Sequence, residues 1–536
     1  MQARLDWCLG GRRPIEYVET IGLFAAYLIL DRVTHAAARL SGEDVTEPLL
    51  LAGAITSNRS TWLITTTGGV AALLCGRARL ACRWEAMEHG KVLRLMALGP
   101  LVLLAWSSSL YHYNFLAGRW HVADRMLVAG LTAASLYRPL WLIPLVIELR
   151  VIAAQFTLPF GTAVGQNIDA LLITGLVGLA ALYTLHLTMG TRRSSPVILL
   201  FSTALASHFF VPGAAKVTLG WIAVDHIWNL PLSAYTAGWM ASTSGSWARS
   251  TAGLAKAFNQ PLLLATLVVE IGAALAVVHT RLLRVWIPLA MILHVLIFAV
   301  TGFWFIAWIV LEASLLIVLW RPELRPWTAG HVTPAFGLLA ATIVVLGGER
   351  LYHPPRLSWL DGPVSYGYAL EGTGTSGAAY HVPLSVGAPF QQELSFVRLQ
   401  LASTGDASAA YGAVGTREAY RHLHTIESFD VLARYERTLP HPAAGPGSAS
   451  ERFMVTLLAH INRHGPDPWF VRPPPTHFWT SRPDPVYAYQ EPLARLDVIR
   501  VTALHRGTDQ LFRRELVLRV DAGRDGTAHV SARAMP

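Results

Sequence analysis

The stretch "HFFVPGAAKVTLGW", residues 208–221, carries the side chains most suited to chemistry. It ends a long apolar segment and contains Lys216, with His208 eight residues earlier and Trp221 five residues later. A lysine at a helix end can send its amine to lipid headgroups. Small neighbours, as in "PGAAK", instead allow close helix packing, and a desolvated lysine can act as a neutral base. His208 lies on nearly the same helical face, where it either packs or joins the chemistry.

Ionisable residues also interrupt other apolar segments. Glu270 lies in "LLLATLVVEIGAAL", His294 in "IPLAMILHVLIFAV", and Glu312 in the next apolar segment. Such residues cost free energy in a membrane and tend to be functional or paired. Glu270 and His294, on consecutive segments, either form an interhelical hydrogen bond or belong to a binding site.

Two further histidines, His112 and His121, flank the loop "HYNFLAGRWH". This loop is predicted to share the outer side with Lys216, so both histidines are candidate catalytic residues. No Cys/His cluster has the spacing of a zinc site, and we predict no metal centre.

The composition is typical of a membrane protein. Of 536 residues, 53% are hydrophobic and 14% charged, with a mean hydropathy of +0.40. Soluble domains carry about 25% charge. The net charge of +9 lies largely in short arginine-rich loops, which indicates topology rather than a nucleic-acid partner. The cysteines Cys8, Cys75 and Cys82 all precede the polar C-terminal region, which excludes a disulfide framework there.

A helix needs about 20 apolar residues to cross a bilayer. Segments that approach this length predict a polytopic α-helical membrane region over residues 1–351, with about 9–11 spans. The candidate spans are 18–38, 60–76, 92–111, 122–138, 139–156, 167–190, 195–217, 260–280, 284–301, 303–320 and 333–351.

The arginine-rich loops predict the orientation. The loop 76–94 is strongly basic, so it should be cytoplasmic, and the N-terminus falls on the same side. Eleven spans then place the C-terminus outside the cytoplasm. The tryptophan-rich stretch 218–259 also falls outside, and we expect it to lie on the outer leaflet.

The remainder, 352–536, changes in character and is predicted to form an extracytoplasmic β-rich or α/β domain. The segments 393–403, 496–506 and 515–523 alternate as strands do. The segments 416–439 and 450–464 read as helices.

The order of these motifs resembles the vitamin K-dependent gamma-carboxylase family, whose membrane part is often called the HTTM (horizontally transferred transmembrane) domain. "PGAAKVTLGW" is similar to that family's lysine helix, with tryptophan five residues after the lysine. "IPLAMILHVLIFAVTGFWFIAWIVLEASLL" resembles the segment with the family's mid-helix histidine, and "SSLYHYNFLAGRWHVADRMLVAGLTAASLYRPL" resembles its outer loop and helix. The resemblance covers about 90–320. The family usually has a lysine pair and acidic residues before the tryptophan, where this chain has "AK" and "VTLG".

The resemblance implies an enzyme that couples epoxidation of a reduced vitamin K-type naphthoquinone (menaquinol or phylloquinol) by O2 to carboxylation of a protein glutamate with CO2. Lys216 would be the quinol base, and His121 or His112 would lie near the reacting centre. Trp221, His208, His294 and Glu270 would shape the quinol site. A peptide or protein substrate would approach from the outer face.

Two other classes of function stay open. The chain could be a non-catalytic membrane anchor that presents the tail for assembly, which requires nothing of Lys216. It could also be a transporter, as the mid-span Glu270, His294 and Asp169 suggest, although no internal repeat is present. The Ala- and Arg-rich composition is typical of a GC-rich bacterial genome, so we expect the bacterial inner membrane.

Overall fold

The computed structural model describes most of both predicted regions. The described residues are 14–38, 49–57, 82–110, 122–157, 167–190, 193–224, 226–236, 245–302, 305–325, 334–351, 362–387, 417–438, 449–464, 486–506, 509–523 and 527–533.

The apolar segments within these ranges are helices. They are α2 (Pro14–Ala37), α6 (Gly90–Leu110), α8 (Val122–Tyr137), α9 (Leu142–Thr157), α10 (Asn167–Met189), α11 (Pro196–Leu219), α14 (Asn259–Ala276), α15 (Thr280–Thr301), α16 (Ile306–Trp320) and α18 (Pro334–Leu351). A short helix, α3 (Leu50–Ser57), precedes the predicted span 60–76, which lies outside the described residues. Pro139 separates α8 from α9, as predicted, and starts a single turn of 3-10 helix.

Within the described residues, five helices are long and apolar enough to cross a membrane, namely α6, α10, α11, α14 and α15. They differ in burial: 83% of the α11 span is buried by protein, against 28% of the α15 span. The outer face of α15 exposes large apolar side chains such as Leu282, Val285 and Ile292. Apolar surface on this scale is compatible with a lipid surround, so the helices are compatible with an integral membrane protein.

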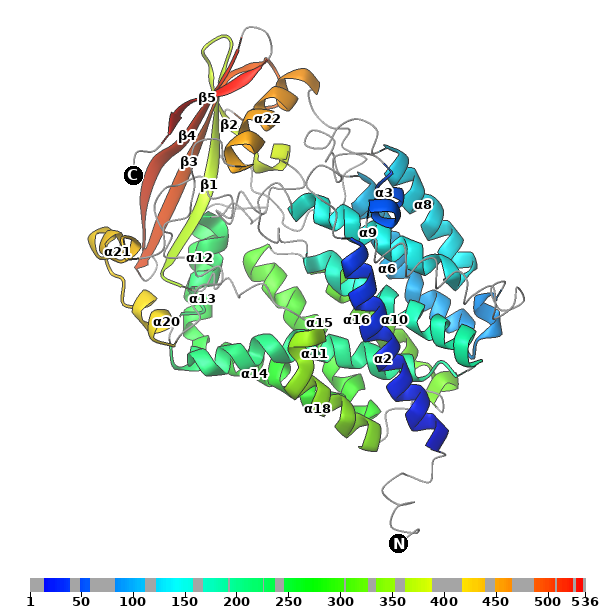
Figure 1. The fold of residues 1–536 in the computed structure, drawn as a ribbon. Helices are drawn as coiled ribbons and strands as arrows, with labels where there is room; N and C mark the ends of the chain where they lie inside the picture. Colours follow the sequence, from blue (N-terminus) through cyan, green and yellow to red (C-terminus); the bar gives the residue numbers. More distant parts are fainter. Residues whose placement is uncertain are drawn as a thin grey trace.

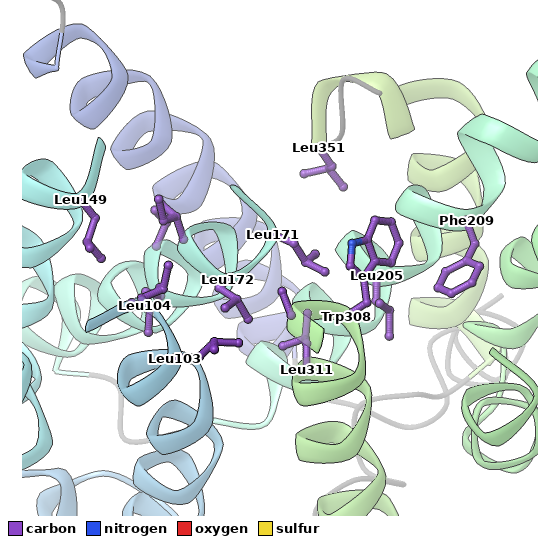
Figure 2. Packing of buried hydrophobic residues seen from close by; sticks show 14 of the residues in the cluster. Leu103, Leu104, Leu149, Leu171, Leu172, Leu205, Phe209, Trp308, Leu311 and Leu351 are labelled. Atoms are coloured by element: carbon purple, nitrogen blue, oxygen red, sulfur yellow. The ribbon is translucent and has the colours of Figure 1, made fainter. Parts of the chain in front are cut away.

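Helix α11 lies at the centre of the helical part and packs against α18, α14, α10 and α16 (Figure 1). Figure 2 shows Leu205 and Phe209 of α11 close to Trp308 and Leu311 of α16, in one continuous apolar core. Gly220 ends the helix in a left-handed conformation (φ +76°) and donates its N–H to Lys216 O and Val217 O. The last turn of α11, with Lys216, is therefore fixed by its own cap.

The C-terminal region contains a five-stranded antiparallel sheet, in the order β2-β1-β3-β4-β5. The strands are β1 (Val364–Gly374), β2 (Ala379–Val382), β3 (Leu493–Arg506), β4 (Asp509–Ala522) and β5 (Ala528–Arg533). The predicted strand 496–506 lies within β3, and 515–523 lies within β4 except for its last residue. The predicted strand 393–403 lies outside the described residues. Helix α22 (Ala449–His464) packs against β3, β4 and β5.

The predicted helix 416–439 is wrong as a single element. It is divided into α20 (Arg417–Leu423) and α21 (Phe429–Glu436). Ser428 starts α21 because its hydroxyl accepts a hydrogen bond from Val431 N at 3.3 Å. The two short helices can therefore point in different directions and contact different parts of the protein.

The tryptophan-rich stretch 218–259 is partly folded between the two regions. It contains a 3-10 turn at Trp221–Ala223 and the helices α12 (Asn229–Thr236) and α13 (Gly245–Ala257). Helix α12 contacts α15 on one side and strands β1 and β3 on the other (Figure 1). The part of the stretch in α12 is thus a packed connection to the sheet rather than only a surface belt.

Buried polar contacts fix this connection. His505 of β3 lies 3.2 Å from Ser233 Oγ of α12 and 3.0 Å from Ser365 Oγ of β1, both through Nε2. Gln510 Nε2 of β4 donates to His505 Nδ1 at 3.2 Å and to Leu232 O of α12 at 3.3 Å. Burial lowers the pKa of His505 to about 3, so it is a neutral hydrogen-bonding partner near pH 7.

Candidate functional site

The Lys216 side chain is paired with a carboxylate of another helix. Its amine donates a hydrogen bond to Glu270 Oε1 on the neighbouring helix α14, and the two side chains form an ion pair. Only 11% of the Lys216 side chain and 9% of the Glu270 side chain are exposed. A pair removed from water to this degree is stable only when each charge keeps its partner.

The close approach of α11 and α14 depends on a small residue. A Cβ atom added to Gly213 would lie 2.8 Å from Glu270 Cβ. Gly213 therefore brings the two backbones together one turn before Lys216, in the way small residues do at membrane helix interfaces. Gly213 of "PGAAK" thus allows the close helix packing that was one of the two alternatives for this stretch.

Trp221 covers the same lysine from the other side. The Lys216 amine lies 5.1 Å from the centre of the Trp221 ring, within the range of a cation–π contact. Trp221 is buried, and its carbonyl accepts a hydrogen bond from His226 Nε2 at 3.0 Å. Asn259 Oδ1, at the start of α14, accepts the backbone N–H groups of His226 and Ile227 at 3.3 and 2.9 Å. The turn with Trp221 is therefore joined to the helix that carries Glu270.

Lysine is rare in this chain. Lysine and arginine total 43, but the only lysines are Lys91, Lys216 and Lys256. Lys91 and Lys256 are exposed, whereas only 11% of the Lys216 side chain is exposed. An amine can release its proton when it is desolvated, whereas a guanidinium stays charged. The residue type at this buried position is therefore the one that acid–base chemistry needs.

A second buried pair lies between α15 and α16. His294 Nδ1 lies 3.1 Å from Glu312 Oε1 and 3.3 Å from Oε2, and both side chains are almost completely buried. Of the two alternatives for Glu270 and His294, a hydrogen bond between them is not the one seen, because each side chain is paired with another residue. Each has a different partner because α14 carries Glu270 against α11, while His294 faces α16.

Aromatic rings fill the space around the second pair. Phe209 of α11 contacts Trp286 and His294 of α15, with ring centres 5.0 and 5.1 Å apart, and Trp308 of α16 at 5.5 Å. Trp286 Nε1 donates to Val269 O, the residue before Glu270, at 2.8 Å. The two pairs are thus linked through the packing of four helices.

The other predicted site residues have different outcomes. His208 is buried, lies 2.7 Å from Ala204 O through Nδ1, and packs edge-on against Trp308 at 5.1 Å. His208 thus meets α16, while Lys216 meets α14. His112 and His121 lie outside the described residues, as does the side chain of Asp169.

Sequence reasoning missed His226 and Asn259, and it gave Glu312 no partner. A weak signal for Asn259 was available, since it lies at the start of an apolar segment where a polar side chain can bond a neighbouring loop. Within the described residues, no group of three or more His, Cys, Asp or Glu side chains could hold a metal ion.

The site combines an amine, two carboxylates and an imidazole in apolar surroundings. Such an arrangement can hold and move protons away from water. No family model, curated protein or solved structure matches the chain. The resemblance to the vitamin K-dependent carboxylase family therefore stays a prediction from the sequence motifs.

Proposed function

We propose that the protein is an integral membrane enzyme in which Lys216 and Glu270 form the reactive acid–base pair. The observation that carries this proposal is the burial of Lys216 against Glu270 and Trp221. A non-catalytic anchor does not need a lysine that is packed against a carboxylate and a tryptophan, because its lysine could extend to the headgroups. Burial of an ion pair is costly and is often retained for a functional reason.

The pair can supply a neutral amine. Glu270 Oε1 accepts the hydrogen bond from the Lys216 amine, so a proton that moves along this bond leaves an uncharged amine and a carboxylic acid. Neutralisation removes two opposite charges from an apolar site, which lowers the cost of the transfer there. Lys216 would then accept a proton from a hydroxyl of a bound substrate, while Trp221 and the small residues of α11 limit access of water.

The substrate class that fits best is a reduced naphthoquinone, such as menaquinol or phylloquinol. Its acidic hydroxyl suits the Lys216–Glu270 pair, and its fused rings suit the aromatic side chains Trp221, Phe209 and Trp308. These residues, with His208 and His294, would hold the quinol. When bound, the quinol would supply, with O2, the strong base that a gamma-glutamyl carboxylase needs to add CO2 to a protein glutamate.

The arrangement of the chain in the membrane is part of the proposal. We place the N-terminus in the cytoplasm of a bacterial cell, about 9–11 spans in the inner membrane, and residues 352–536 outside the cytoplasm. The last turn of α11, with Lys216, lies beside α20 of the C-terminal region, which supports an approach of a peptide or protein substrate from that side.

A proton-coupled transporter is the second candidate. The observation in its favour is the second buried pair, His294–Glu312, because ionisable pairs inside a membrane often mark proton pathways. A transporter would move its substrate across a sealed vesicle without oxidising it.

The test is oxygen-dependent oxidation of a reduced naphthoquinone by the purified protein in lipid. We expect epoxide formation by the wild type, none by Lys216→Ala, and wild-type rates for Lys256→Ala, which removes an exposed lysine. An absence of turnover in folded wild type, or equal turnover in Lys216→Ala, would refute the quinol proposal.

A further inference from the structure

A row of rings connects Lys216 to the C-terminal region. Beyond Trp221, the ring of His226 lies at 5.2 Å, and that of His424, just after α20, lies 5.3 Å from His226. Tyr420 of α20 contacts both histidines, at 6.1 Å from His226 and 4.5 Å from His424. His226 and Tyr420 are almost completely buried, so these rings lie inside the interface between the helical part and the C-terminal region.

The same helix meets the end of α11 directly. A Cβ atom added to Gly220 would lie 2.9 Å from Arg417 Nε, at the first residue of α20. Gly220 is four residues after Lys216 and directly before Trp221. Helix α20 therefore packs against the short segment that contains both Lys216 and Trp221.

The hydrogen bonds fix the rings of this row. His226 Nε2–H donates to Trp221 O at 3.0 Å, which holds the imidazole against the tryptophan. His424 Nδ1 lies 2.8 Å from Tyr420 O, so the second imidazole is held by its own helix. A displacement of α20 must therefore change the support of His226 and, through it, of Trp221.

We propose that α20 is a functional part of the Lys216 site, in which Tyr420 and His424 are positioning residues that hold Trp221 against the Lys216 amine through His226. The site is then shared between the helical part and the C-terminal region. This inference goes beyond the proposed function and does not need the quinol reaction to be correct.

The test measures the reactivity of the Lys216 amine. Reductive methylation by formaldehyde and a borane reagent, followed by mass spectrometry, gives the rate at each lysine of the full-length protein in lipid. Lys91 and Lys256 are exposed and serve as internal references. We expect His424→Ala to raise the rate at Lys216, relative to both references, by about fivefold, because the cation–π cover is lost.

The control lies on the same helix. His422 packs against Tyr435 of α21, with ring centres 4.6 Å apart, and His422→Ala should leave the Lys216 rate unchanged. His424→Phe keeps a ring at the interface and should restore the wild-type rate to within about twofold. If His424→Ala acted only by loosening the fold, the phenyl ring of His424→Phe would not restore the Lys216 rate.

The proposal is overturned if His424→Ala and His422→Ala give the same Lys216 rate, or if His424→Phe behaves as His424→Ala. If His424→Ala is not recovered folded, Tyr420→Leu decides by the same measurement. A raised Lys216 rate in that variant supports the proposal, and an unchanged rate overturns it.

Discussion

Lys216 on α11 and Glu270 on α14 are joined where a glycine allows their helices to come closest. The Lys216 amine contacts Glu270 Oε1, and Gly213 lies against Glu270 Cβ. The ion pair and the helix contact therefore depend on each other. Either one can be removed separately, so their contributions can be measured.

Removing one partner of the Lys216–Glu270 pair should destabilise the fold more than removing both partners. We expect Lys216→Met to lower the free energy of unfolding by about 3–5 kcal/mol, because Glu270 is left as an unpaired buried charge. The double variant with Glu270→Leu should recover most of that loss. Unfolding by denaturant in lipid–detergent micelles measures both, with Lys256→Met as the control at an exposed lysine. Equal losses in the single and double variants would contradict a buried pair.

A methyl group at Gly213 should separate α11 from α14. Gly213→Ala would place a carbon 2.8 Å from Glu270 Cβ and 3.1 Å from Ile271 Cδ1, so we expect a loss of about 1–3 kcal/mol. Gly272 of α14 is the matched control, since an added Cβ there meets no atom within 4 Å. Gly272→Ala should be neutral or stabilising by up to about 1 kcal/mol. The melting temperature should therefore fall in Gly213→Ala and should stay the same or rise in Gly272→Ala.

The His294–Glu312 pair should depend on an acceptor rather than on charge alone. Glu312→Gln keeps an oxygen that can accept from His294 Nδ1–H, whereas Glu312→Leu leaves this buried donor without a partner. We expect Glu312→Leu to cost about 1–3 kcal/mol of stability and Glu312→Gln to cost less. Denaturant unfolding ranks the two variants, and a reversed order would exclude the hydrogen bond.

The contact between the sheet and α12 should weaken in acid. The pKa of His505 is lowered by burial to about 3, while an unfolded histidine titrates near 6.5. Between these two pH values, the unfolded chain therefore binds a proton at His505 and the folded chain does not. The stability from neutral His505 is complete above about pH 6.5 and is lost as the pH falls towards 3.

Thermal unfolding from pH 7 to pH 4 measures this effect. The wild-type melting temperature should fall more steeply than that of His505→Gln, which has no titratable group there. His529→Gln, at an exposed position of β5, should keep the wild-type slope. A wild-type slope in His505→Gln would show that other groups dominate the acid response.

Much of this architecture was predictable from local sequence. Apolar length predicted the long helices α2, α6, α8 to α11, α14 to α16 and α18, but not the short α12 and α13. Alternation predicted β3 and β4, because burial on a helix or a pleated strand leaves a local pattern. Lys216 stood out as well, since a lysine among small residues in an apolar segment breaks that pattern. The sequence left open whether its amine turns to lipid headgroups or packs against protein, and the structure pairs it with Glu270.

The partners were not predictable in the same way. Glu270 and His294 lie on consecutive segments, and neighbourhood in sequence suggested that they meet. Helices α14 and α15 do pack together, but Glu270 lies on the face of α14 towards α11 and His294 on the face of α15 towards α16. The roles of His226 and His424 depend on contacts across about 200 residues, for which a single sequence carries no periodic signal.

The contact between Ser233 and His505 has a consequence for synthesis of the chain. The two residues are 272 positions apart, so α12 is made long before its partner strand. At a translation rate of about 5–20 residues per second, α12 must wait at least several seconds for β3. During that time Ser233 and Leu232 lack their later partners in the sheet. The hydrogen bonds that join α12 to β3 and β4 can therefore form only after the last strands are made.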